Sequence, residues 1–206
     1  MIVRSVSQTR KNICQVCFDD GSAFRIHIEV AMSAGLRPGC EISEEKLNEL
    51  IEESEFCLAR EYALRILASH ATSKYKLKER LCERFDEDIA EAVAAQMAEV
   101  GAVNDSEYAF FLAADMLRLK NYGDSRVLRE LRQKGISWED AEDALQRVYD
   151  EFPEDVPDEP GRIRRLVEIK RLSPDDEAAQ RRFINSLIRL GYDYSDIKAE
   201  LSLLEE

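Results

Sequence analysis

The feature that most constrains this chain is a helical unit that occurs more than once. Residues 123–148 have the pattern of two short helices joined by a tight turn. Gly135 stands where the first helix ends, and Ser137 is placed to cap the second. A shift of 56 residues (191 − 135 = 56) lays Gly135 on Gly191 without a gap in the flanks. A repeat of this period indicates an array in which each unit covers the next.

The copies agree at the positions that would form the core and the caps of the helices. A looser copy lies upstream at a shift of 50, with Leu77 in the place of Val127, and it lacks the turn glycine. The array therefore has three units. The pairs matched at the shift of 56 include Arg126/Arg182, Leu131/Leu187, Trp138/Tyr194, Asp140/Asp196 and Leu145/Leu201.

Residues 2–30 differ in pattern from the rest of the chain, because they consist of short β-prone runs broken by Asp20-Gly21. The Asp-Gly pair predicts a hairpin turn. An alternation of apolar side chains from Phe24 to Val30 predicts a half-buried strand. We expect a small antiparallel sheet of two or three strands, packed on the helices because such a sheet is unstable alone.

Capping signals divide the remaining sequence into helices. Ser43 is expected to open a helix that ends near Glu52, and a longer helix is expected to start near Ser54. Thr72 is expected to cap a short basic helix, and Asn104 the first helix of the central repeat.

Composition changes at residues 152–161, which hold three of the five prolines and four carboxylates. This stretch predicts a solvated linker. In the repeat that follows, Ser173-Pro174 is expected to start the second helix. The first helix of that repeat is expected to contain Ile163, Leu166, Val167 and Ile169.

These patterns predict a mostly α protein with three tandem three-helix, helix-turn-helix-like repeats and a small N-terminal antiparallel β extension. The expected parts are an extension with a short helix at 1–52, a first repeat at 53–103, a second at 104–151, an acidic Pro-rich linker at 152–161 and a third repeat at 162–206.

The charge distribution limits the classes of partner. A net charge of −13 disfavours a binder of naked DNA, because such affinity comes largely from neutralising phosphates. Residues 118–134, however, carry six basic and two acidic side chains, a net of +4, whereas residues 139–159 carry ten acidic and one basic, a net of −9. Such alternation fits a charged partner, and equally fits solvated helix faces.

The N-terminal sequence bears on location. No apolar run approaches the ~20 residues that a membrane-spanning helix needs, and Arg4, Arg10 and Lys11 interrupt the start too early for a signal peptide. Five irregularly spaced cysteines fit reduced thiols. We expect a cytoplasmic protein without a membrane partner.

Cys14-x-x-Cys17 invites a zinc interpretation, with Cys40 and His27 as completions. Structural zinc usually takes paired ligand clusters, and two thiols three residues apart on a strand point to opposite faces. Buried or half-buried thiols are therefore favoured, and no metal is expected. The sequence holds no nucleophile elbow, phosphate loop or metal-binding His pair. We expect neither catalysis nor a cofactor.

Basic side chains are better candidates for a binding function. At about 100° per residue, Val127, Leu128 and Leu131 centre the buried face of their helix, and the residues opposite them face outward. Arginine suits recognition because its fork binds carboxylate or phosphate, although ordinary solvation of a helix is the alternative. The candidate partner-binding residues are Arg126, Arg129 and Gln133, and in the last repeat Arg182, Asn185 and Arg189.

Trp138 and its counterpart Tyr194 stand just inside a helix N-terminus in their repeats. Aromatic residues at such positions usually pack against the core, which is the favoured interpretation here. Anchoring of an interface is the alternative.

Several segments have an informative order and spacing: NDSEYA from Asn104, Gly123, LRQKGIS from Leu131, and the stretch from Ala63 to Leu81 with Ser73 and Leu77. Together they resemble the RecX regulatory proteins. The resemblance covers about residues 54–150 and extends to the last repeat at the level of pattern, and the N-terminal strands with the loop GLRPG resemble an extension that some members carry.

The resemblance implies tandem three-helix repeats that bind the RecA nucleoprotein filament. It also implies restraint of the ATPase, strand-exchange and coprotease activities of RecA, without catalysis by this chain. We expect a monomer, and contact with the DNA of the filament stays open. The alternatives are a direct nucleic-acid-binding repeat protein, which steep salt dependence on bare DNA would favour, and a helical-repeat scaffold for another protein partner.

Overall fold

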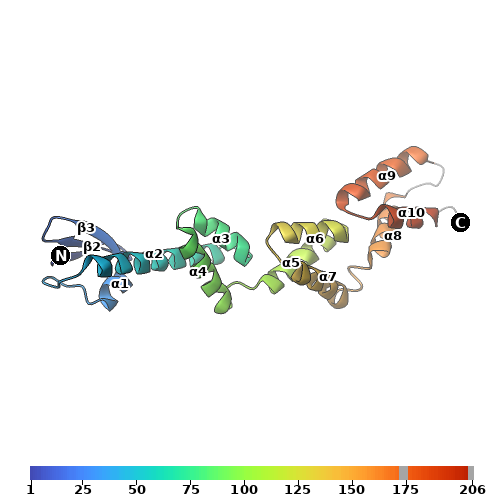
Figure 1. Ribbon diagram of the computed structural model, residues 1–206. Coiled ribbons are helices and arrows are strands. Elements are labelled where there is room, and N and C mark those ends of the chain that lie inside the picture. The colour runs from blue at the N-terminus through green and yellow to red at the C-terminus, as the bar shows by residue number, and fades with distance from the viewer. Residues whose placement is uncertain (172–175, 204–206) are drawn as a thin grey trace. The chain divides into compact units, whose positions relative to one another are not determined.

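The computed structural model describes residues 1–171 and 176–203, and these form two compact units (Figure 1). The first unit holds residues 1–71 and 77–102, and the second holds residues 72–76 and 103–206. One helix is divided between them, since its first turn groups with the repeats that follow.

The first unit begins with a three-stranded antiparallel sheet in the order β1 (Val3–Arg10), β2 (Ile13–Phe18) and β3 (Ala23–His27). Alternate residues of β2 enter the core, and Gly21 turns the chain toward β3 with φ +89°. Figure 1 shows α2 (Glu44–Leu67) running past the sheet, and its Leu47 and Leu50 belong to the same core. The sheet is therefore held by a helix, as its small size requires.

The predicted strand through Val30 is too long. β3 ends at His27, and α1 (Ile28–Ser33) begins there instead. The His27 side chain accepts a hydrogen bond from the Glu29 N–H at 3.3 Å. This cap ends the strand, and periodicity alone does not reveal it.

The two helices predicted around Glu52 and Ser54 are one continuous helix, α2. Ser54 does not cap a second helix, because it is buried and its hydroxyl accepts the His27 N–H at 2.7 Å. That bond ties the end of β3 to the middle of α2. The cap predicted at Ser43 is confirmed, since its hydroxyl accepts the Lys46 N–H at 3.1 Å.

α3 (Lys74–Cys82) and α4 (Glu87–Glu99) complete the first helix triplet. Ser73, and not the predicted Thr72, caps α3, since its hydroxyl accepts the Lys76 N–H at 3.2 Å. Leu77 of α3 is fully buried.

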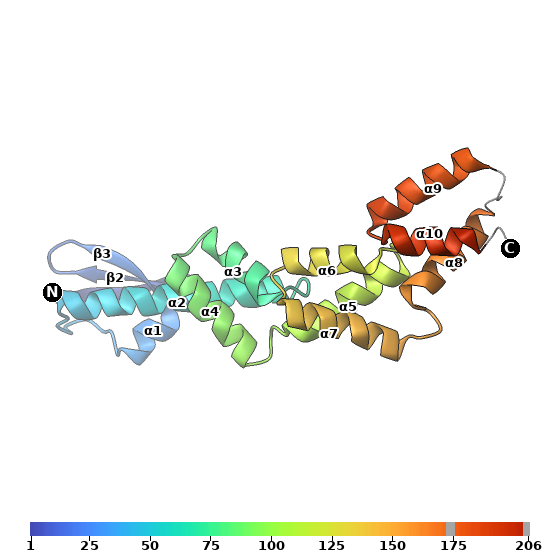
Figure 2. The same cartoon turned by 45° about the vertical axis from the view of Figure 1, so that its right-hand side comes forward.

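The second unit contains the triplet of α5 (Asp105–Arg118), α6 (Asp124–Gln133) and α7 (Trp138–Glu151). Small buried residues, Ala109 and Ala113 among them, allow α5 to lie close to α7 (Figure 2). The predicted caps are confirmed, because Asn104 accepts the Glu107 N–H and Ser137 accepts the Asp140 N–H.

The last triplet consists of α8 (Glu159–Lys170), α9 (Glu177–Leu190) and α10 (Tyr194–Ser202). The turn glycines have the predicted left-handed conformation, with φ +80° at Gly135 and +93° at Gly191. All four apolar residues predicted for the first helix of this repeat lie in α8, where Ile163 and Val167 are buried and Ile169 is exposed. The helix start predicted at Ser173-Pro174 lies outside the described residues, and Asp176 caps α9.

The segment 152–161 is not the solvated linker that its composition predicts. Val156 is only 1% exposed and belongs to the core of the second triplet, and the Phe152 ring stacks on Phe110 with centroids 6.0 Å apart. Asp158 caps α8, with Pro160 in its first turn. Composition suggested a solvated segment because it is rich in charged side chains, but the apolar residues between them pack against the second triplet.

The predicted fold class is confirmed, with three tandem three-helix units behind a small β extension. Within the part of the chain that the structure describes, no helix combines the length and apolarity needed to cross a membrane.

Candidate partner-binding surface

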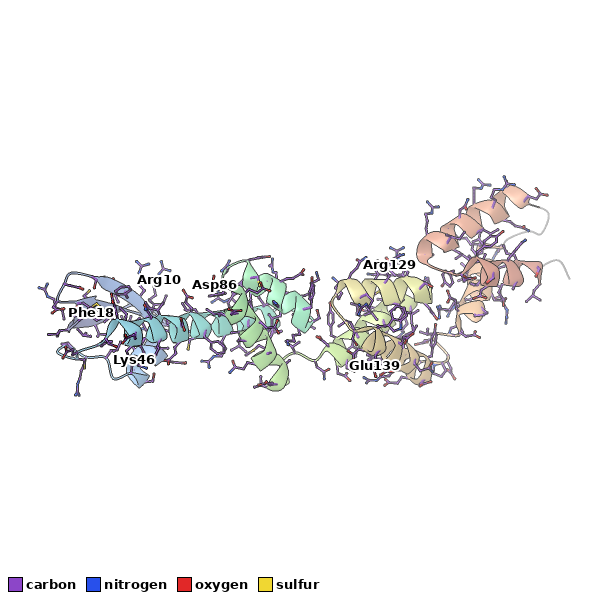
Figure 3. All side chains as sticks on the ribbon, in the orientation of Figure 1. Arg10, Phe18, Lys46, Asp86, Arg129 and Glu139 are labelled. Carbon is purple, nitrogen blue, oxygen red and sulfur yellow. The ribbon has the colours of Figure 1, made fainter. Side chains whose placement is uncertain are left out.

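The predicted partner-binding residues lie on α6 and α9, the middle helices of the last two repeats. Figure 3 shows Arg129 on the outer side of α6. The structure gives Arg129, Arg182 and Arg189 no ion pair with any described residue, whereas Arg147 on α7 binds both Glu107 and Glu151 at 2.6 Å. Five of the six predicted residues are exposed: Arg129, Gln133, Arg182, Asn185 and Arg189.

Arg126, the sixth, is only partly exposed, and its side chain interacts within the chain. Its guanidinium lies 3.8 Å from the centroid of the Tyr122 ring. One terminal nitrogen donates to the Arg189 carbonyl at 2.8 Å, and the other donates to the Tyr122 hydroxyl at 3.2 Å. Arg126 therefore joins the second repeat to the third.

Close packing at the Gly191 turn explains the position of Arg126. A Cβ atom at Gly191 would overlap Arg126, and one at Gly123 would lie 2.5 Å from the Gly191 carbonyl carbon. The Gly123 N–H donates to the Leu190 carbonyl at 2.9 Å. The start of α6 thus lies directly on the turn between α9 and α10, and glycine is needed on both sides.

A similar joint lies within the second unit, between residues 72–76 and the second repeat. The first turn of α3 lies on the Gly135 turn, where a Cβ atom would overlap Tyr75. The Ser73 hydroxyl donates to the Lys134 carbonyl at 2.5 Å, and the Lys74 N–H donates to Asp105 Oδ1 at 2.7 Å. An acid at the start of one repeat therefore caps the middle helix of the repeat before it.

At the second joint Glu159 lies near the first turn of α6, where the Asp124 backbone acts to lower the pKa of its carboxyl. A buried ionic cluster surrounds it. Arg162 is 5% exposed and donates to Asp124 Oδ1 at 2.5 Å and to the Tyr149 hydroxyl at 2.6 Å. Tyr149 in turn donates to Asp124 Oδ1 at 2.6 Å. A buried arginine needs such partners, because desolvating its charge is costly.

Burial controls the protonation of this cluster. It raises the pKa of Glu159 to about 7, with a further contribution from Asp124 and an opposing one from Arg162. Burial also raises the pKa of the Tyr149 hydroxyl. One Glu159 oxygen is buried without a hydrogen-bond partner, which fits a carboxyl group that holds a proton near neutral pH.

An aromatic residue adjoins the candidate surface in the third repeat. Asn185 and Tyr194 line one cavity of about 400 Å³ between α9 and α10, together with Ile188. Tyr194 is 53% exposed and Trp138 is 54% exposed, so the favoured packing interpretation is wrong for both. Since the shift of 56 pairs Arg129 with Asn185, the second and third repeats each have a polar residue and an exposed aromatic at equivalent positions.

We define the repeat surface as the exposed polar residues of α6 and α9 with these two aromatics. Sequence reasoning found its polar members and missed the joints. A signal was present, because the shifts of 50 and 56 align Ser73 with Gly123 and Lys134 with Leu190. A shift does not reveal which aligned residues touch.

The cysteine pair does not form a site. Cys14 points into the core of the sheet and Cys17 toward its other face, as their spacing on β2 requires.

The fold and this surface define a tandem three-helix-repeat protein that presents equivalent polar and aromatic positions from successive repeats. Residues 104–145 match the model of the second three-helix domain of RecX. The regulatory protein RecX of Amycolatopsis mediterranei (strain U-32) is 31% identical over 162 residues, which cover 74% of this chain and 89% of that protein. This chain belongs to the RecX family of regulatory proteins.

Other relatives and solved structures agree. The regulatory protein RecX of Clostridioides difficile (strain 630) is 28% identical over 206 residues, covering 98% of this chain and 95% of that protein. A crystal structure of regulatory protein RecX has a TM-score of 0.70 at 19% identity and covers 96% of this chain and 98% of its own. RecX from Lactobacillus salivarius has a TM-score of 0.60 at 22% identity, covering 73% and 97%. These two structures share the fold.

Proposed function

We propose that this chain regulates the RecA recombinase by docking on its nucleoprotein filament through the repeat surface. Docking restrains the ATPase, strand-exchange and coprotease activities of RecA without catalysis by this chain. Membership of the RecX family supports the proposal. The observation that supports the repeat surface as the docking site is the recurrence of exposed polar and aromatic residues. They lie on α6 and α9 and at the starts of α7 and α10.

Repetition suits a filament. A filament presents the same surface at regular intervals, so two equivalent surfaces on one chain can bind two successive sites. The second contact is then intramolecular, and the combined affinity exceeds that of either contact alone.

The chemistry of the surface suits an anionic partner. Arg129, Arg182 and Arg189 have no ion pair among the described residues, so their donors can reach carboxylates of a protein or phosphates of DNA. Trp138 and Tyr194 add apolar area of the kind that anchors interfaces.

The test is the ATPase activity of RecA on single-stranded DNA while the purified chain is titrated. The proposal predicts a fall in ATP turnover that saturates with the chain and weakens as salt rises, because exposed charges are screened. Unchanged ATPase activity at a saturating excess, with no binding of the chain to assembled filaments, would contradict it.

Direct binding of nucleic acid is the second candidate, favoured by the net charge of +4 over residues 118–134. Fluorescence anisotropy with bare single-stranded DNA separates the two. Tight binding with a steep dependence on salt, in the absence of RecA, would favour this candidate over filament docking.

A further inference from the structure

The N-terminal unit, far in sequence from the repeat surface, brings together an imidazole, a thiol and a carboxylate. His27, Glu29 and Cys57 each offer one ligand atom, and these atoms all lie within 4.8 Å of one another. They come from the end of β3, the first turn of α1 and the middle of α2. The Ser54 bond to His27 fixes these elements against each other.

The imidazole is oriented as in a metal ligand. His27 is 1% exposed, and its Nε2 lies 3.2 Å from Glu61 Oε1. Asn12 also donates to that Glu61 oxygen and so fixes the carboxylate. A carboxylate on one ring nitrogen holds the proton there and leaves the other nitrogen basic, which is the usual support of a metal-binding histidine.

The remaining nitrogen has only a weak partner. Nδ1 of His27 accepts the Glu29 N–H at 3.3 Å, at the long end for a hydrogen bond. The Glu29 carboxylate binds Arg60 through Oε2 at 2.9 Å, so Oε1 is available to a cation. A carboxylate shared between an arginine and a metal remains oriented by the arginine.

A pocket gives solvent and ions access to these groups. Its volume is about 650 Å³, and both Glu29 and Cys57 line it. Glu52, Glu53 and Asp88 also line the pocket, and their carboxylates attract cations. Water in the pocket can supply a further ligand.

We propose that His27, Glu29 and Cys57 bind a divalent transition metal of the zinc class, with water from the pocket as the fourth ligand. Imidazole nitrogen, thiolate sulfur and carboxylate oxygen are the three donor types of protein zinc sites, and four ligands are the usual number. Mixed nitrogen and sulfur donors select such a metal over magnesium or calcium. The Cys57 thiol loses its proton to solvent on binding.

The metal would join β3 and α1 to α2 across 30 residues of sequence (57 − 27 = 30). It therefore stabilises the β extension, which is too small to be stable alone. The Cys14-x-x-Cys17 pattern drew attention to His27 but to the wrong thiols. Cys57 escaped notice because folding, and not spacing, brings it to His27.

The test uses the full chain, stripped with a chelator and titrated with Co²⁺ and then Zn²⁺. We expect one Co²⁺ per chain, with the near-ultraviolet absorption of a thiolate–cobalt bond, and displacement of Co²⁺ by Zn²⁺. Cys57→Ser should abolish this absorption and weaken Zn²⁺ binding at least ~10-fold. Cys82→Ser is the matched control, because Cys82 is an exposed free thiol elsewhere in the chain, and it should bind as the wild type does.

Replacing the buried His27 risks unfolding, so Glu29→Gln is the second variant, with circular dichroism to confirm the fold. It should weaken Zn²⁺ binding ~10-fold and keep the thiolate–cobalt absorption. The proposal is overturned if the wild type shows no thiolate–cobalt absorption. It is equally overturned if Cys57→Ser binds Zn²⁺ as tightly as the wild type.

Discussion

The two joints between repeats have the same geometry but different chemistry. At the first, the Ser73 hydroxyl and the Lys74 N–H make hydrogen bonds to the next repeat, and Tyr75 covers the turn glycine. At the second, Gly123 makes a backbone bond, and the Asp124–Arg162 pair is enclosed. Both joints thus contain a glycine turn, while the residues at the start of the middle helix differ.

The comparison also separates two arginines that the sequence treats as equivalents. Arg126 bonds to the third repeat, whereas Arg182, at the same position of its own repeat, donates to the Ala178 carbonyl one turn earlier in α9 at 3.1 Å. Arg126 therefore contributes to a joint between repeats, whereas Arg182 stays on the exposed face of α9, although the repeat aligns the two residues.

The largest expected effect on stability comes from breaking the Arg162–Asp124 ion pair. Arg162→Met should destabilise the third repeat by ~3–5 kcal/mol, because it leaves Asp124 without its buried partner. Hydrogen exchange should show loss of protection in α8–α10 before α5–α7. Arg165→Met on the same helix is the control, and it should change stability by less than ~0.5 kcal/mol because Arg165 is exposed. Equal effects of the two substitutions would rule out a special role for the second joint.

The turn glycines should rank next. Gly191→Val should cost ~2–5 kcal/mol, since it adds a clash with the Arg126 backbone to the strain of a positive φ. Gly135→Val should cost a similar amount, because the nearest atom there is the Cβ of Tyr75, which moves only with its backbone. Gly101→Val, with φ +72° and open space around it, measures strain alone. If denaturant unfolding shows the same loss for all three, close packing is not what these turns require.

The Glu159 carboxyl makes the second joint sensitive to pH. Its folded-state pKa of about 7 exceeds the ordinary 4.5, so the folded state holds the proton more tightly. Stability from this group is full below pH ~4.5 and is lost as the pH rises through ~7, by roughly 1–3 kcal/mol. Glu159→Gln should remove this dependence of stability on pH. Stability curves of wild type and variant that run parallel from pH 5 to 8 would refute the assignment.

The smallest effect tests the first joint. Ser73→Ala should cost ~0.5–2 kcal/mol, because it removes both the cap of α3 and the bond to Lys134. Thr72→Ala next to it should be nearly neutral in the same thermal melts, since Ser73 is the cap. A larger loss of stability from Thr72→Ala than from Ser73→Ala would instead support Thr72 as the cap of α3.

Local signals in the sequence predicted much of the fold. Gly135 and Gly191 identified the turns, and Asn104 and Ser137 the caps, because these interactions lie within a few residues. Predictions failed where a distant contact decides. Ser54 resembles a helix start but bonds to β3, and Val156 stands among charges but packs in the core.

For the candidate surface, too, the sequence predicted which residues are exposed but not which residues contact another repeat. Helical geometry identified Arg129 and Arg189 as exposed, since exposure follows from the position of the apolar face. It could not show that Arg126 contacts the next repeat or that Arg162 is buried with Asp124. Such facts depend on how one repeat packs on another, which no periodicity within a repeat contains.

The proposed docking of the repeat surface on RecA is tested by the triple variant Arg129→Glu, Arg182→Glu, Arg189→Glu. Arg126 is left intact because it holds the joint. The matched control reverses Arg10, Lys11 and Arg25, three exposed cations of the β extension, with the same change in net charge. With both variants shown to be folded by circular dichroism, the account predicts that the control inhibits RecA ATPase as the wild type does. It predicts at least ~10-fold weaker inhibition by the triple variant. Full inhibition by the folded triple variant would contradict the account.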